Sequence, residues 1–317
     1  MTKVTTAAID LSHRPRHRSL LAAREAGWGL VFLSPWIIGL VLFTALPMLA
    51  SLVLSFTNFD LVHPEAIQFV GLRNYQNMLR DPVVMQSLGV TASFAIMSVP
   101  LGLGVSLGLA LLLNHRLLAG KRLFRTLFFM PIQIPLVAST FIWLGFLNGR
   151  TGWLTYILEG FGIPAPDWFS STTWALPGLA LMGIWGIGNM MLIFLAGLQS
   201  VPTELYEAAR VDGARRWTLF RHITLPMISP VFFYNLLISL IAAFQYFTQA
   251  YVVSNGSGDP GGSTLFFNLA LYREAFVFNQ MGYGSALAWL MFAIVLGLSL
   301  LLFRSAGRWV YYAASDR

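Results

Sequence analysis

The segment EAARVDGARRWTLFRHITLP, residues 207–226, is basic and amphipathic, yet long apolar runs precede and follow it. Four arginines and a histidine lie within these 20 positions, between stretches that carry almost no charge. What a folded, charged segment does at this point, and on which side of a membrane it lies, decides the fold and most of the function.

The composition is that of an integral membrane protein. Of the 317 residues, 56% are hydrophobic and 10% are charged, whereas soluble domains carry about 25% charged residues. The sequence contains no cysteine, which excludes disulfides, thiolate catalysis and zinc–thiolate sites. A formal charge of +7 would also suit a nucleic-acid-binding protein. The distribution of the basic residues favours the positive-inside rule of membrane proteins instead, so we expect no nucleic-acid partner.

Six stretches lack Asp, Glu, Lys and Arg and are long enough to span a bilayer, which takes about 20 apolar residues in a helix. They are residues 26–58, 82–113, 126–149, 168–203, 223–258 and 275–303. The sequence therefore predicts an all-α integral membrane fold with six transmembrane helices. The first run is too long for the apolar core of a signal peptide, so we interpret the basic N-terminus as a cytoplasmic tail that faces lipid headgroups.

The lysines and arginines orient the chain. If both termini are cytoplasmic, the inner segments hold 16 of the 20 basic residues. The outer loops then hold only Arg73, Arg80, Arg150 and Arg273, which is the asymmetry that the positive-inside rule describes. The predicted organisation is a cytoplasmic tail at 1–27, a transmembrane domain at 28–306 with a cytoplasmic loop at 203–226, and a cytoplasmic C-terminal tail at 307–317.

Prolines interrupt the apolar runs at Pro35, Pro47, Pro100, Pro131, Pro135 and Pro177. A proline frees a backbone carbonyl, which neighbouring helices can satisfy within a membrane. Each of the six marks either a bend in a helix or a local packing irregularity, and both interpretations stay open.

No catalytic or metal-binding constellation is recognisable. His13 and His17 are four positions apart, but Pro15 lies between them and no third ligand is near, so we expect no metal site. The pair Gly120–Lys121 lacks the upstream glycine and the following Ser or Thr of a phosphate-binding loop. We therefore expect neither an enzyme nor a cofactor in this chain.

The apolar runs also argue against a secondary transporter. None of them carries an Asp, Glu, Lys or Arg, which proton- and ion-coupled transporters commonly need within the membrane. No internal repeat suggests two inverted halves. The energy for any transport is thus expected to come from another protein.

Residues 203–212 are predicted to form a short helix within the cytoplasmic loop. Thr203 is expected to cap its N-terminus, because a Thr hydroxyl can accept from the free N–H groups there. Glu204 and Glu207 favour the positive end of the helix dipole, and Gly213 suits a left-handed exit. A stiff helix tied directly to two transmembrane helices is a lever that another protein can push.

The loop matches a family pattern. The spacing E-A-A, three residues, G, nine residues and I-x-L-P is filled without a gap by Glu207, Ala208, Ala209, Gly213, Ile223, Leu225 and Pro226. Seven fixed residues at about 7% each give a chance match of about one in 10⁸ per start position. The segment resembles the EAA loop in the inner-membrane permeases of binding-protein-dependent ABC importers.

Longer stretches are similar to the carbohydrate-importer permeases of that family. They are FVGLRNYQNML (69–79), FRTLFFMPIQIP (124–135), GLQSVPTELYEAARVDGA (197–214), NGSGDPGGST (255–264) and YREAFVFNQMGYGSALAW (272–289). The likeness is to the first of that family's two different permease subunits, of the maltose and glycerol-phosphate permease type. The N-terminal tail and the loop lengths carry no family information.

The resemblance implies a location and partners. Such permeases lie in the bacterial inner membrane and pair with a second, different permease subunit. They work with two ATPase subunits, which bind the ATP and magnesium, and with an extracytoplasmic sugar-binding protein. The EAA helix docks in a cleft of the ATPase, and this role carries over to Glu207, Ala208, Ala209 and Gly213, while Ile223, Leu225 and Pro226 complete the coupling loop. This chain would supply half of the pathway for a mono- or oligosaccharide.

The family forms its substrate cavity on the helices that flank the loop, and polar residues occur there. At about 100° per residue, a continuous helix would place Asn235, Ser239, Tyr246 and Gln249 on one face, with Phe244 and Gln245 pointing elsewhere. On the preceding helix, Trp185 and Asn189 are four apart. Amides, hydroxyls and aromatic platforms suit an uncharged sugar. The same residues suit contacts between membrane helices equally well.

Two alternatives stay open at this point. The same machine could import another cargo, such as glycerol-phosphate, a polyamine, a peptide or an ion; an acidic ring in the pore would indicate polyamines, and the sequence shows none. A secondary transporter would show intramembrane charges or internal symmetry, and neither is present. A membrane scaffold would not need the glycine and the I-x-L-P spacing.

Overall fold

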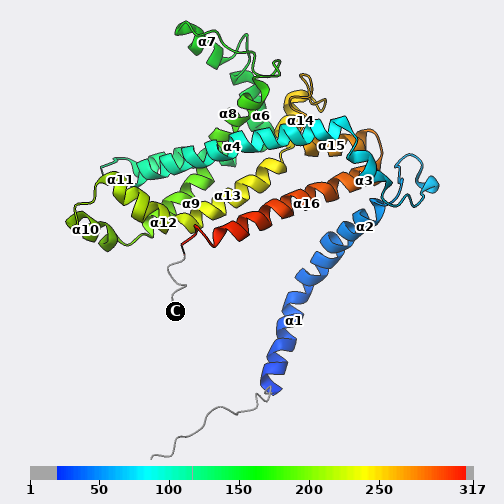
Figure 1. The fold of residues 1–317 in the computed structure, drawn as a ribbon, viewed down its shortest axis with the longest axis horizontal. Coiled ribbons are helices and arrows are strands. Elements are labelled where there is room, and N and C mark those ends of the chain that lie inside the picture. Colours follow the sequence, from blue (N-terminus) through cyan, green and yellow to red (C-terminus); the bar gives the residue numbers. More distant parts are fainter. Residues whose placement is uncertain (1–19, 116, 312–317) are drawn as a thin grey trace, which may run out of the picture. The chain divides into compact units, whose positions relative to one another are not determined.

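The computed structural model describes residues 20–115 and 117–311, and within them the chain is helical with short connections (Figure 1). An isolated antiparallel bridge joins Thr57 to Phe69. The chain divides into two compact units, Met1–Val53 and Leu54–Arg317. The predicted all-α class is confirmed for the described residues. Residues 1–19 of the predicted N-terminal tail and 312–317 of the C-terminal tail lie outside them.

The described part of the first unit is one apolar helical span. α1 (Leu20–Leu40) passes into a π-helical turn, η1 (Val41–Ala45), which leads into α2 (Leu46–Leu54). Pro35 lies inside α1 and Pro47 in the first turn of α2, and the helix continues through both. The stretch Gly27–Leu54 is long and apolar enough to cross a membrane.

Three long helices of the second unit run alongside one another, namely α4 (Pro82–Asn114), α13 (Ser229–Phe244) and α16 (Met281–Ala306) (Figure 1). α9 (Gly188–Gln199) packs against both α4 and α13. Its Met191 and Phe194 are completely buried in these contacts. Burial of whole apolar side chains between helices builds the core that fixes their arrangement.

Two further apolar stretches are bent. α5 (Lys121–Phe129) and the 3₁₀ turn η3 (Met130–Gln133) meet α6 (Leu136–Phe146) at 103°, and α8 (Ala175–Trp185) meets α9 at 54°. Within residues 20–115 and 117–311, four helices are long and apolar enough to cross a membrane, or up to six if each bent pair is one span. Pro131 and Pro135 lie at the sharper bend. At the other bend, a Cβ on Gly188 would overlap the carbonyl oxygen of Phe128, so only glycine permits this approach of α9 to α5.

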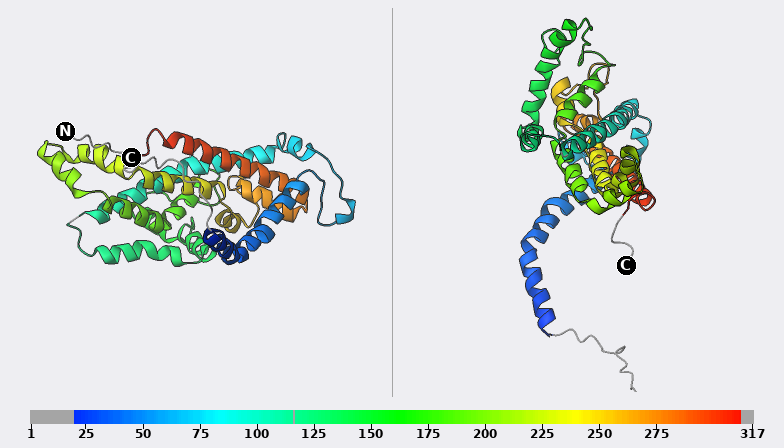
Figure 2. Two further views of the ribbon diagram at one scale, coloured as in Figure 1. Left: turned by 90° about the horizontal axis from the view of Figure 1, so that it is seen from below. Right: turned by 90° about the vertical axis from the view of Figure 1, so that its left-hand side faces the viewer.

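Short elements occupy the two ends of the second unit (Figure 2). One end, called the α10 end below, carries α10 (Thr203–Val211), α11 (Arg216–Leu219), the π-helical turn η4 (Phe220–Thr224) and α12 (Leu225–Met227). The opposite end, called the α3 end, carries η2 (Pro64–Ala66), α3 (Arg73–Met78), α15 (Phe267–Tyr272) and the π-helical turn η5 (Arg273–Val277). Away from the bundle, α7 (Trp153–Gly160) follows α6.

Polar side chains fasten the α3 end. One carboxylate oxygen of Asp81 accepts from the backbone N–H of Val83 at 2.8 Å and so caps α4. The other accepts from the Tyr283 hydroxyl at 3.0 Å, which joins the start of α4 to the start of α16. The buried Asn74 amide donates to two backbone carbonyls of the preceding segment, at 2.8 Å each. These bonds fix where the long helices begin.

Candidate functional site

The helix predicted in the charged loop is α10, and it ends at Val211, one residue earlier than expected. Thr203 was expected to be its cap, and this is wrong. Pro202 occupies the cap position with φ −57° and ψ 132°, and Thr203 is the first helical residue without a side-chain capping bond. The φ of Pro202 would suit a helix, but its extended ψ does not, so α10 begins at the next residue.

The C-terminus of α10 has the predicted left-handed exit. Gly213 has φ +79°, its N–H donates to the Arg210 carbonyl at 3.0 Å, and the Ala214 N–H donates to the Ala209 carbonyl at 2.9 Å. This pair of bonds is a Schellman motif, which satisfies carbonyls that a helix end leaves free. The glycine of the EAA pattern therefore ends the helix sharply and sends the chain back toward α11.

The exposed surface of α10 combines residues of the EAA pattern with apolar side chains. Glu207 and Ala208 are exposed and Ala209 is half-buried. Leu205 is 41% exposed and Val211 is 90% exposed. A rigid helix that offers small and apolar side chains can lie in an apolar groove of a partner protein. Leu205 and Val211 were not singled out from the sequence. Each is three residues from Ala208, the spacing that places residues on one face of a helix.

A hydroxyl pair ties α10 to the next span. The Tyr206 hydroxyl and the Thr224 hydroxyl are 3.0 Å apart and hydrogen-bonded, and Thr224 is buried. Thr224 closes the π-helical turn η4 and also donates to the Leu219 carbonyl at 3.4 Å. Sequence reasoning missed both residues. The available signal was that Thr224 fills the unspecified position of I-x-L-P.

The remaining residues of the pattern build the connection from η4 to α13. Ile223 is half-buried against the core, Leu225 is 38% exposed, and Pro226 lies in the first turn of α12. The Pro226 carbonyl accepts from the Ser229 hydroxyl at 2.6 Å, at the first residue of α13. Hydrogen-bonded turns therefore connect α10 to α13.

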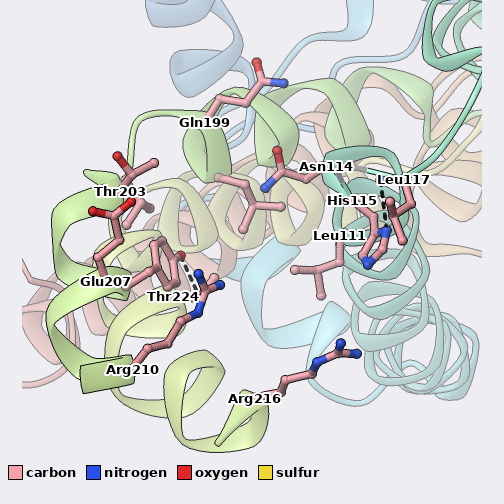
Figure 3. Close-up of a pocket in the computed structure, with 13 residues that line it drawn as sticks. Leu111, Asn114, His115, Leu117, Gln199, Thr203, Glu207, Arg210, Arg216 and Thr224 are labelled. Carbon is pink, nitrogen blue, oxygen red and sulfur yellow. Dashed lines mark hydrogen bonds between the residues drawn. The ribbon is translucent and has the colours of Figure 1, made fainter. Parts of the chain in front are cut away.

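A pocket of about 740 Å³ lies beside α10 (Figure 3). Its wall comes from the last turn of α4 and the residues after it, from the end of α9, from α10, and from Arg216 and Thr224. Glu207 and Arg210 of α10 both line it, as do Asn114 and His115. One edge of α10 thus faces a polar hollow within this chain.

A cavity of about 480 Å³ lies between α4, α8, α9 and α13. It brings together three of the predicted substrate residues, Ser239, Tyr246 and Gln249. Its other polar lining residues are Ser98, Gln245 and Thr248, and none of its lining residues is charged. The wall therefore offers neutral donors and acceptors among apolar surfaces, as sites for small polar ligands do.

Two hydroxyls on this wall are unsatisfied. The oxygens of Ser239 and Tyr246 are buried and have no hydrogen-bond partner among the described residues. A buried polar group without a partner costs about 1–3 kcal/mol. The Tyr246 ring is already packed between Phe94 and Phe266, with ring centroids 4.5 and 4.8 Å away. Its ring faces are therefore already in contact with aromatic neighbours, while its hydroxyl lacks a described partner.

The reason these residues meet differs from the prediction. Residues 235–249 do not form one continuous helix, because α13 ends at Phe244 and α14 (Thr248–Ser254) begins after a non-helical break. The expectation that Gln245 points elsewhere is wrong, since it lines the cavity. The break turns the chain so that residues on both sides of it reach the same hollow.

The second bent span contributes Trp185. It lines a neighbouring cavity of about 580 Å³, formed by η3, α6 and α8, and Gln249 lines this cavity too. Trp185 also makes an edge-to-face contact with Trp143, with ring centroids 5.9 Å apart. Asn189 is exposed on α9 and lines neither cavity. Asn235 is 3% exposed, lines neither cavity, and its amide nitrogen has no described partner.

A small polar pocket of about 250 Å³ lies at the α3 end, lined by Asn74, Asn77, Asp81, Glu274, Gln280 and Tyr283. Burial raises the pKa of the Glu274 carboxyl, the nearby Asp81 carboxylate raises it further, and Arg273 lowers it. Residues 20–115 and 117–311 contain no group of three or more His, Cys, Asp or Glu side chains suited to a metal ion. His13 and His17 lie outside these ranges.

The family comparison covers the coupling loop and most of the spans. Residues 101–310 match the model for a binding-protein-dependent transport system inner membrane component. The probable ABC transporter permease protein YesP of Bacillus subtilis (strain 168) is 42% identical over 95% of this chain and 96% of its own length. The arabinooligosaccharides transport system permease protein AraP of the same organism is 32% identical over 90% and 94%. The trehalose/maltose transport system permease protein MalF of Thermococcus litoralis is 33% identical over 89% and 94%.

Solved structures show the same fold. A chain from the crystal structure of a bacterial alginate ABC transporter, in complex with an alginate pentasaccharide-bound periplasmic protein, aligns with a TM-score of 0.78 at 20% identity. The alignment covers 92% of this chain and 98% of that one. Another structure of a bacterial alginate importer gives a TM-score of 0.72. With the family match and the 42% identical permease, these findings identify a transport component and not an enzyme. The chain belongs to the family of binding-protein-dependent transport system inner membrane components, the membrane permeases of ABC importers.

Proposed function

We propose that this permease is a pore-forming subunit of an importer for a mono- or oligosaccharide. The observation that carries the proposal is the uncharged wall of the 480 Å³ cavity, on which the Ser239 and Tyr246 hydroxyls lack a described partner. Sugar hydroxyls both donate and accept, so they would satisfy such groups without bringing a charge into the membrane. The arabinooligosaccharide and trehalose/maltose permeases among the relatives support the same class of cargo.

Each predicted substrate residue has a place in this proposal. Ser239, Tyr246 and Gln249 would bond the sugar in the cavity, and Trp185 would meet it in the neighbouring one. Asn189 is exposed, so it would contact the sugar where a second permease subunit completes the pathway. Asn235 lies on α13 with Ser239 but lines neither cavity, so it would contact the sugar only if α13 moved.

In the proposed topology, each bent pair crosses the membrane once, which gives six spans with both termini in the cytoplasm. Residues 1–27 and 307–317 are then cytoplasmic tails, and 28–306 form the transmembrane domain with its coupling loop at 203–226. The clustering of Arg210, Arg215, Arg216 and Arg221 at the α10 end supports a cytoplasmic position for that end.

We assign the docking of the ATPase to α10. Its exposed Glu207 and Ala208, with Ala209 and Gly213, form the contact, and Ile223, Leu225 and Pro226 carry the displacement into α13. The hydrogen bond between Tyr206 and Thr224 supports this route, because it couples α10 to the turn that precedes α13. α13 carries Ser239, so a displacement of α10 that reaches α13 would also move the wall of the cavity.

The importer that this implies has four further components. Two ATPase subunits bind ATP and magnesium, a second, different permease provides the other half of the pathway, and an extracytoplasmic sugar-binding protein delivers the cargo. Closure of the ATPases around ATP would drive the coupling helices and turn the cavity from the cytoplasmic to the outer side. This chain needs no cofactor of its own in that cycle.

The test is ATP-driven uptake of radiolabelled sugars by the reconstituted importer, with Tyr246→Phe as the variant. The substitution keeps the ring between Phe94 and Phe266 and removes only the hydroxyl. Loss of one hydrogen bond of about 1–1.5 kcal/mol predicts a five- to tenfold lower uptake rate. Assembly with the ATPase should be unchanged.

Tyr234→Phe is the matched control, because Tyr234 lies on α13, is 50% exposed and lines neither cavity. Its uptake rate should equal that of the parent protein. Import of a charged solute in place of any sugar, or an equal rate for both variants, would contradict the assignment of this cavity to a sugar.

A further inference from the structure

An apolar groove of about 380 Å³ lies between the end of α4 and α5. Its lining residues are Leu109, Leu112, Leu113, His115, Leu117, Leu118, Phe124 and Phe128. Leu112 and Leu117 are 64% and 87% exposed, so the groove opens to the surroundings of this chain. His115 is the one polar side chain among these lining residues, and the groove can therefore receive hydrocarbon but offers almost nothing to a polar molecule.

The polar pocket beside α10 adjoins this groove. His115 and Leu117 line both hollows, so the two meet at the turn after α4. Figure 3 shows Arg216 and His115 on the same side of the polar pocket, with Glu207 and Thr203 at its opposite margin and Arg210 between them. Of the two arginines, Arg216 thus lies toward His115 and Leu117, where the polar pocket meets the apolar groove, and Arg210 lies on the side of Glu207.

The arginines of the pocket form no ion pair within the described residues, although Glu207 lines the same pocket. Neither Arg210 nor Arg216 forms an ion pair with any residue in 20–115 or 117–311. α5 adds Lys121 and Arg122 in the turn before Phe124, which lines the groove. Unpaired guanidinium groups attract phosphate strongly because their planar N–H groups can donate two parallel hydrogen bonds.

We propose that these adjoining hollows bind a phospholipid with an anionic headgroup. The acyl chain lies in the α4–α5 groove, and the phosphate lies beside Arg210 and Arg216. A soluble anion would leave the groove empty, and a zwitterionic lipid would leave the excess positive charge unbalanced, so an anionic amphiphile fits both parts. Arg210 belongs to α10, and the lipid therefore contacts the coupling helix on the edge that faces α4. The inference needs a membrane permease but no particular cargo.

The test counts bound lipid by native mass spectrometry on the full-length chain, purified with the subunits that accompany it. Dioleoylphosphatidylglycerol is titrated against dioleoylphosphatidylcholine, which has the same acyl chains. We expect saturable binding of the phosphatidylglycerol and clearly weaker binding of the phosphatidylcholine. Each basic residue near a lipid headgroup contributes about fivefold in affinity, so Arg210→Gln with Arg216→Gln should weaken phosphatidylglycerol binding about 30-fold.

Matched variants separate the site from general charge and general stability. Arg304→Gln with Arg308→Gln removes the same charge from exposed positions at the end of α16, which line neither hollow, and should leave lipid binding unchanged. Leu112→Ser in the groove should weaken phosphatidylglycerol binding without touching α10. Leu123→Ser, at a position that is 62% exposed on α5 and lines neither hollow, should not.

Four outcomes would overturn the proposal. Equal binding of the two lipids would make the groove an ordinary lipid-facing surface. Displacement of the lipid by millimolar glycerol phosphate alone would indicate a soluble-anion site. Binding by the isolated chain but not by the assembled transporter would mean that a partner subunit covers the hollows. Unchanged binding in the Arg210→Gln/Arg216→Gln variant would remove the arginines from the site.

Discussion

At the scale of single residues, Gly213 shows why a glycine stands in the EAA pattern. Its φ of +79° lies in the left-handed region, while a Cβ at this position would meet nothing within 4 Å. Backbone conformation therefore requires the glycine here, and lack of space does not. Left-handed exits belong to the few residues around a helix end, which is why the sequence could predict this one.

Gly213→Val should disrupt the exit from α10, because a β-branched residue in the left-handed region costs about 1–2 kcal/mol. We expect several-fold less ATPase to co-purify with the valine variant in mild detergent. Gly213→Asn is the matched control, since asparagine tolerates this conformation, and it should retain the ATPase. Equal recovery with valine and asparagine would mean that the exit geometry does not matter for docking.

Other residue roles were beyond sequence reasoning. Thr203 had the right chemistry for a cap, but Pro202 takes the cap position because its own backbone is extended there. The Tyr206–Thr224 bond joins positions 18 residues apart across two turns, and no local pattern predicts such a distance. The neighbourhood of a side chain, unlike its backbone preference, depends on the whole fold.

At the scale of elements, α4, η5 and α16 meet in the polar pocket at the α3 end. Asp81 of the α4 cap accepts a hydrogen bond from the Tyr283 hydroxyl of α16. The Asp81 charge also raises the pKa of Glu274 of η5. Because burial and Asp81 raise the pKa of Glu274, its ionised form is less favourable in the folded protein than in the unfolded chain. This junction therefore loses stability when Glu274 ionises.

The sign of the resulting pH effect is definite. The penalty is absent below the ordinary glutamate pKa of about 4.3 and grows as pH rises through the raised folded-state pKa. Glu274→Gln should therefore raise the thermal unfolding temperature at pH 7 and leave it unchanged near pH 4, as measured by tryptophan fluorescence in detergent. Glu159→Gln, an exposed control on α7, should change neither. A stabilising effect that grows toward low pH would contradict this account.

The apolar runs predicted where the spans lie, but not how they bend. Pro131 and Pro135 mark the 103° bend, whereas the 54° bend lies at Gly186 and Gly188, and Pro177, for which both interpretations were open, lies inside α8. The break between α13 and α14 has no proline or glycine nearby, so local sequence gave no sign of it. Tyr246 and Gln249 were selected on the premise of a continuous helix, and they line the cavity because that helix is interrupted.

At the scale of the whole molecule, the cavity is a product of tertiary structure. Its wall joins Phe94 and Ser98 of α4 to residues of α13 that follow more than a hundred positions later. Sequence reasoning found Ser239 and Tyr246 because polar residues are conspicuous in apolar helices. It could not find the α4 side of the wall, since contacts between distant helices are decided by packing.

The proposed topology can be tested cleanly because the chain has no cysteine. Arg221→Cys at the α10 end and Trp153→Cys on α7 each introduce a single exposed thiol. With a membrane-impermeant maleimide, we expect Trp153→Cys to react in intact cells and Arg221→Cys only after the membrane is opened. The reverse pattern would contradict the orientation, and reaction of both in intact cells would contradict a crossing by the α8–α9 pair, which lies between the two positions.

The π-helical turn η4 has a mechanical consequence for the path from α10 to the cavity. A π-helical turn is an α-helical turn that holds one extra residue, and that residue can pass along a helix while the backbone hydrogen bonds exchange partners. Each such step shifts the register of the residues that it passes by one position, which turns their side chains by about 100° about the helix axis. The Tyr206–Thr224 bond fastens α10 to the last residue of this turn, ahead of α13. A small exchange of hydrogen bonds in η4 would therefore turn Thr224 and its neighbours toward or away from Tyr206 while the helix axis hardly moves.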